Sequence, residues 1–241
     1  MRESADRAPR LIELRFTPQP RDAAWELSEA GAGARVGLLG WVLDAPNVDA
    51  GVPPKAAGIV ARAACRQHVL IFHHRVAIEH GAHRTWIDVP GGWTCVLEPP
   101  TIKRLLGRPA LPLVATSDPA RAEELFHSEG FSWELRAQTV LLFQAGSPPP
   151  SLSYVMLEDA LSGRASARPR LGLPADIRGL LLPGVDGDFV ELVAFDEPLW
   201  RTLPAELASE CAKSGVGWNV VSEDEFKQTR WFRQSGPSEP A

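Results

Sequence analysis

Alternation of apolar and polar residues predicts most of the strands in this chain. Residues 11–16 alternate as a strand with one buried face does. Residues 85–89 and 93–97 flank Pro90-Gly91-Gly92, a composition typical of a hairpin turn. The predicted strands are 11–16, 36–43, 69–78, 85–89, 93–97, 113–116, 139–143, 179–182, 189–195 and 218–221.

Helical spacing of apolar residues predicts the helices. The clearest is 55–66, where the apolar residues fall on one stripe. A later helix carries Leu203, Leu207 and Cys211 at four-residue intervals, and we expect Pro204 in its first turn. Further helices are predicted at 21–30, 101–106, 119–128 and 152–161. The mixture of elements predicts an α+β (mixed α/β) fold.

Two segments share a local pattern. Residues 113–119 read LVATSDP and residues 192–198 read LVAFDEP, and each is followed by a predicted helix and a Gly-x-x-Trp sequence. In each, an acidic residue caps the helix and a proline starts it. We expect two related strand–helix–strand halves. Internal duplication and convergence on common capping residues both explain the match.

Proline-rich composition suggests the domain boundaries. Three consecutive prolines interrupt both helix and strand within 146–151. We therefore predict a larger mixed α/β region at 1–145, a Pro-rich linker at 146–151, a smaller α/β region at 152–233 and a disordered tail at 234–241.

Composition narrows the class of protein. The 241 residues are 44% hydrophobic and 23% charged, as in ordinary globular chains, and the net charge is -5. An acidic chain with no Lys/Arg run argues against nucleic-acid binding. No apolar run suits a signal peptide or a membrane helix, and three cysteines suggest a reducing compartment. We expect a soluble, cytoplasmic protein, and the 21 arginines against four lysines suggest a GC-rich bacterial genome.

Five histidines are clustered in the first half of the chain: His68, His73, His74, His80 and His83. Imidazole nitrogens bind divalent transition metals, and Glu79 or Asp88 could complete a site built on His68, His74, His80 and His83. No His-Glu-x-x-His or Cys-x-x-Cys spacing supports this site. The alternative is a strand that carries scattered histidines and needs no cofactor.

Other chemical signatures are weak. Cys95 follows a Gly-Gly-Trp turn and has histidines nearby in sequence, but its apolar neighbours favour a buried thiol. Asp186-Gly187-Asp188 lacks the further ligands of a calcium loop and suits a hairpin turn. The sequence contains no Gly-x-Gly-x-x-Gly, Walker or Gly-x-Ser-x-Gly motif.

Eight tryptophans and the absence of a catalytic motif favour a non-catalytic, protein-binding function. The concrete hypothesis is a bacterial immunity or antitoxin-like protein whose acidic surface neutralises a basic toxin. We predict the partner-binding residues as Arg230, Trp231, Phe232 and Arg233; the alternative is that this segment docks on the core. The alternative functions are a metal-dependent enzyme built on the histidine segment and a self-associating scaffold subunit.

Overall fold

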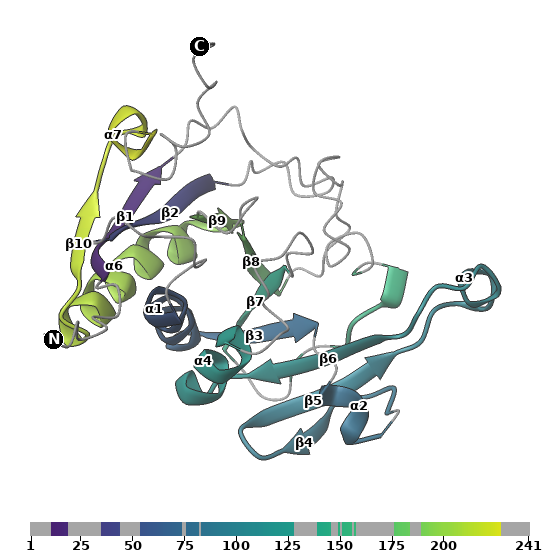
Figure 1. Ribbon diagram of the computed structural model, residues 1–241. Helices are drawn as coiled ribbons and strands as arrows, with labels where there is room; N and C mark the ends of the chain where they lie inside the picture. The colour runs from purple at the N-terminus through teal and green to yellow at the C-terminus, as the bar shows by residue number, and fades with distance from the viewer. Residues whose placement is uncertain are drawn as a thin grey trace, which may run out of the picture.

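The computed structural model describes residues 11–18, 35–43, 54–73, 76–81, 83–127, 139–145, 149, 151–155, 157, 176–183 and 189–227. Within these residues the fold is mixed α+β, with six helices and a ten-stranded, mostly antiparallel open sheet (Figure 1). The fold class predicted from the sequence is therefore confirmed.

The strands lie in the order β10-β1-β2-β9-β8-β7-β3-β6-β5-β4. They are β1 (Leu11–Pro18), β2 (Arg35–Leu43), β3 (His68–His73), β4 (Ile87–Val89), β5 (Gly92–Leu97), β6 (Leu111–Thr116), β7 (Val140–Gln144), β8 (Ile177–Pro183), β9 (Phe189–Ala194) and β10 (Gly217–Val220). β1 pairs with β10 in parallel, whereas the other described pairs are antiparallel. The sheet is continuous through strands from 1–145 and from 152–233, since β9 and β8 lie between β2 and β7.

Three longer helices cover one face of the sheet. The helices are α1 (Pro54–Cys65), α2 (Val76–Glu79), α3 (Thr101–Leu105), α4 (Pro119–His127), α6 (Glu197–Lys213) and α7 (Glu223–Lys227). α1 packs against both α4 and α6, as Figure 1 shows. None of the helices in the described ranges is long and apolar enough to cross a membrane.

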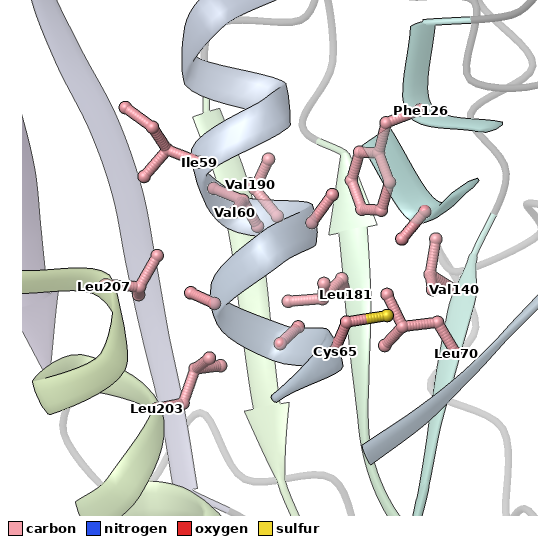
Figure 2. Close-up of a cluster of buried hydrophobic side chains, with 14 of the residues drawn as sticks. Ile59, Val60, Cys65, Leu70, Phe126, Val140, Leu181, Val190, Leu203 and Leu207 are labelled. Atoms are coloured by element: carbon pink, nitrogen blue, oxygen red, sulfur yellow. The ribbon is translucent and has the colours of Figure 1, made fainter. Parts of the chain in front are cut away.

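Both faces of the sheet are buried, because alternate strand residues point to opposite sides. On the face covered by α1, α4 and α6, which we call the helix face, apolar side chains from the helices meet those of the strands (Figure 2). The labelled members are Ile59, Val60, Cys65, Leu70, Phe126, Val140, Leu181, Val190, Leu203 and Leu207. The opposite face holds a second cluster, to which residues 151–157 contribute Leu152, Tyr154 and Leu157. Burial on both sides explains why β3, β6 and β7 read as nearly continuous apolar runs.

Both segments have strand–helix–strand order, although the predicted Gly-x-x-Trp of the first, residues 130–133, lies outside the described residues. β6, α4 and β7 form the first, with β3 between its two strands; β9, α6 and β10 form the second, with β2 and β1 between. Pairing through the intervening strands makes the two strands of each unit parallel. Both helices lie on the helix face, so the units share element order and packing.

The residue match that suggested these units is displaced by one position. Leu113 lies in the cluster opposite the helices, whereas Leu192 lies on the helix face. Alignment of the helix caps Asp118 and Asp196 instead matches Leu192 with Val114, which is on the helix face. A shift of one residue reverses the face of every side chain in a strand. The LVA match therefore does not mark equivalent positions.

The predicted strand 69–78 was wrong beyond His73. β3 ends there, and Val76–Glu79 forms the short helix α2. Ala77 is buried on the helix face while Ile78 points to solvent, an arrangement that a helical turn allows. Gly81, with φ +98°, lies just beyond α2 in the left-handed conformation typical of residues that follow a helix.

The expected place of Pro204 was also wrong. α6 begins at Glu197, so Pro204 lies in its interior. The N-terminus of α6 is set by residues before Pro204. The Asp196 carboxylate accepts a hydrogen bond from the Leu199 amide at 2.8 Å, and Pro198 occupies the first turn. Leu203, next to this proline, is buried in the helix-face cluster.

Candidate interaction site

The predicted metal ligands that the structure describes, His68, His80 and His83, lie in two separate places. His68 begins β3 and is buried, with its Nδ1 3.3 Å from the Ala64 carbonyl oxygen. His80 and His83 are exposed and lie beyond the other end of β3, where the His83 carbonyl accepts from the Val96 amide. A six-residue strand spans about 16 Å, too far for ligands of one metal ion. His74 lies outside the described residues.

The described histidines have different local environments. Burial lowers the pKa of the His68 imidazole by disfavouring its charged form. His83 Nε2 lies 3.0 Å from the carbonyl oxygen of His80. Over the described ranges, no three His, Cys, Asp or Glu side chains are grouped as a metal site would require.

The three thiols are buried and weakly acidic. Burial raises the pKa of the Cys95 thiol to about 12, and burial together with the Asp118 charge raises that of Cys65 to about 12. Burial and the neighbouring Glu210 raise the pKa of Cys211 to about 11. A thiol must lose its proton to act as a nucleophile, so burial and the raised pKa values disfavour such a role for these cysteines.

The predicted binding segment at 230–233 lies outside the described residues. α7 ends three residues before it and presents Asp224 and Glu225 to solvent. Phe226 is buried, and its ring occupies the space where a side chain on Gly40 would lie. α7 therefore packs on β2, on the face opposite the three longer helices.

A projecting arm is the most exposed apolar feature in the described part of the chain. It consists of residues 98–110, which connect β5 and β6 and contain α3; Figure 1 shows it extending away from the body of the sheet. Ile102, Leu105 and Leu106 are 75%, 82% and 75% exposed. Side chains of this kind are normally buried, so an exposed cluster of them is a candidate interaction surface.

The arm is held in one conformation by its own hydrogen bonds. Gly107, with φ +74°, allows its amide to bond the Arg104 carbonyl at 3.0 Å and the Arg108 amide to bond the Lys103 carbonyl at 3.0 Å. This is the usual way a helix ends at glycine. The apolar tip is therefore presented by an ordered turn.

Contacts at its base attach the arm to the rest of the chain. The Tyr154 hydroxyl donates to the Pro109 carbonyl at 2.9 Å, and Lys103 Nζ lies 5.9 Å from the centre of the Tyr154 ring. Arg84 forms an ion pair with Glu98 at 2.8 Å. The orientation of the tip is thus set before any partner binds, which reduces the entropy lost on binding.

A groove of about 340 Å³ runs beside the arm. Leu97, Leu152 and Tyr154 supply apolar surface, and the charged side chains that line the same groove are Arg84, Glu98 and Arg104. The groove thus combines apolar surface with charges of both signs, and the Arg84 charge is already paired with Glu98. The groove and the tip together form the candidate interaction site.

The apolar pattern of the arm does not predict this site, but the charges of the arm do indicate it. Ile102 and Leu105 are spaced as on any short buried helix, so their pattern does not show exposure. The better signal is charge, because Lys103, Arg104 and Arg108 concentrate three cations in an acidic chain.

The sequence matches no protein-family profile, and comparisons with curated proteins and with solved structures return no match. The functional conclusion therefore rests on the geometry of the chain itself.

Proposed function

We propose that this chain is a non-catalytic protein-binding protein that docks on its partner through the arm at 98–110. The observation that carries the proposal is the ordered, exposed apolar tip formed by Ile102, Leu105 and Leu106. Burial of one such side chain at an interface contributes about 1.5–3 kcal/mol. The three together supply the apolar centre that protein interfaces use.

Charge around the tip defines the partner. Arg104 and Arg108 are exposed beside the apolar side chains, whereas Arg84, across the groove, is already paired with Glu98. The complementary surface is a protein surface that combines apolar side chains with carboxylates, because opposite charges speed encounter and exclude wrong partners. The immunity-type function belongs to the same class, but a basic toxin would have to bind elsewhere than this cationic arm.

The test compares three forms of the intact chain in a pull-down from an extract of the native host. Leu105→Ser removes an 82% exposed anchor, and Ile78→Ser removes a 59% exposed apolar residue on α2 as a matched control. A protein retained by wild type and Ile78→Ser but lost from Leu105→Ser supports the proposal. We expect the purified pair to lose about 2 kcal/mol of affinity with Leu105→Ser, at unchanged melting temperature.

Two further measurements check the partner class. Arg104→Glu should slow association with the identified partner, and added salt should reduce that difference. Binding of the chain to anionic phosphatidylserine vesicles in a Leu105-dependent manner would identify a lipid surface instead and would overturn the proposal. So would equal retention of every captured protein by all three forms.

A further inference from the structure

β10 lies at one edge of the sheet, and no strand among the described residues covers its outer side. It is the first strand in the sheet order and pairs with β1. Residues 216–221 read VGWNVV and contain neither a charge nor a proline. Both edge strands are short, with four residues in β10 and three in β4, but β4 carries Asp88 and is followed by Pro90. Proteins block exposed edges with such features, so the unblocked edge at β10 is suited to pairing with another strand.

The backbone of β10 shows which groups face outward. The Val221 amide donates to the Phe16 carbonyl of β1 at 2.9 Å. Peptide groups of successive strand residues point to opposite sides, so the N–H and C=O of Val220 and Trp218 point away from β1. Asn219 faces β1. The free edge therefore offers two residues, each with one donor and one acceptor.

The side chains of the same two residues share the helix face. Trp218 stacks on Phe16 with ring centres 6.2 Å apart and packs against the helix-face cluster. Val220 pairs in register with Phe16, and it is 57% exposed. An aromatic and a β-branched side chain thus lie side by side at the edge, and these are favourable partners across antiparallel strands.

We propose that β10 pairs with β10 of a second copy of this chain, antiparallel and centred on Asn219. In this register Trp218 lies opposite the second copy's Val220, and Val220 lies opposite its Trp218. Each such pair exchanges two backbone hydrogen bonds, giving four in total. Two aromatic–valine contacts form on the helix face. A second copy fits because the strand's own pattern complements itself about a two-fold axis, and an uncharged strand repels no copy of itself.

Cysteine cross-linking of the intact chain tests the register. Asn219→Cys places two thiols opposite each other at a non-hydrogen-bonded position, with Cα atoms about 4.5 Å apart, within the range of a disulfide. Val220→Cys is the matched control, because its two copies would lie about 8 Å apart, beyond that range. The native cysteines are buried and should not contribute. Rapid oxidation to a covalent dimer by Asn219→Cys alone supports the pairing. Equal cross-linking of both variants, or of neither, overturns it.

Solution mass supplies a second test. Light scattering of the 26.2 kDa chain should show a dimer whose population rises between about 1 and 100 μM. Val220→Lys should weaken the dimer at least about ten-fold, since it adds a charge to the paired edge. Ile78→Lys, at another exposed apolar residue, should leave it unchanged. A wild-type monomer throughout this range, including one whose Trp218 and Val220 amides are protected from hydrogen exchange by its own chain, would overturn the proposal.

Discussion

A buried carboxylate holds the three helices of the helix face together. The Glu210 side chain on α6 is 5% exposed and contacts Arg62 and Arg66 of α1 as well as Lys213 of its own helix. Arg62 also pairs with Glu123 of α4. The cluster thus links α6, α1 and α4, and the replacement Glu210→Gln removes its central charge while preserving shape.

The loss of unfolding free energy expected for Glu210→Gln follows from the pKa of Glu210. Burial opposes its ionisation, but hydrogen bonds from Arg66, Lys213 and Arg62 outweigh burial and lower the pKa from 4.5 to about 2. That difference corresponds to about 3 kcal/mol. The Arg66 and Lys213 side chains are 40% and 53% exposed, so solvent screening weakens the attraction. We therefore expect Glu210→Gln to lower the free energy of unfolding by about 1–2 kcal/mol at neutral pH.

The contribution of Glu210 to stability should decrease as the pH falls. The pKa is lower in the folded state, so the ionised carboxylate stabilises the fold above about pH 4.5, and this contribution is lost as the pH falls toward 2. Urea unfolding, in which the denaturant is uncharged, should show the difference at about pH 7 and most of it lost at about pH 2.5. Glu206→Gln, at a 26% exposed partner of Arg66, is the control and should cost less. An equal difference at both pH values, or one below about 0.3 kcal/mol at about pH 7, would refute the reasoning.

Three further predictions concern stability and reactivity. Gly92→Ala should cost about 3 kcal/mol in urea unfolding, because φ is +154° and the added Cβ would lie 2.0 Å from the Ala115 carbonyl oxygen; a cost similar to that of an exposed Gly107→Ala change would contradict the close approach. Asp196→Ala should lower stability by about 1–2 kcal/mol, since it removes the α6 cap and an ion pair with Arg178 at 3.1 Å; recovery of most of this loss by Asp196→Asn would assign it to the cap. The native chain should react slowly with a thiol reagent at neutral pH and rapidly, at all three cysteines, once unfolded; fast labelling of the folded chain would disprove the raised pKa values.

Local chemistry explains the parts of the fold that the sequence predicted well. The hairpin of β4 and β5 depends on Gly91 and Gly92, and the starts of α4 and α6 depend on Asp118 and Asp196. These signals act within a few residues, so one sequence is enough to interpret them. The fold class followed from them.

The pairing of strands that are distant in the sequence could not be predicted from such local signals. The order of ten strands depends on which apolar runs meet, and nothing in β8 or β9 specifies that they insert between β2 and β7. The match between the Leu-Val-Ala segments of β6 and β9 was displaced by one residue for a related reason. β6 and β9 are apolar on both faces, so their sequences carry little alternation from which to assign a face.

The candidate site could not be predicted from the apolar pattern of the sequence, and the reason is physical. An apolar turn buried in a core and one exposed at the end of an arm have the same periodicity, and only tertiary structure distinguishes them. The prediction of Trp231 and its neighbours used a comparable signal, aromatic residues beside charges, and falls outside the described residues. That prediction and the arm are thus separate hypotheses, and Leu105→Ser tests only the arm.

The arm and the β10 edge lie far apart in the sheet, and this separation has a consequence for binding. The arm follows β5, the second strand from one end, whereas β10 forms the other end. Strands are spaced by about 4.8 Å, so in the proposed dimer the path from one arm to the other across the joined sheets is roughly 80 Å, and the twist of the sheet makes the direct span shorter. A partner smaller than this span engages one arm at a time, and pairing at β10 then adds no avidity. The dimer and the Val220→Lys monomer should therefore bind such a partner with the same affinity and with one partner per chain.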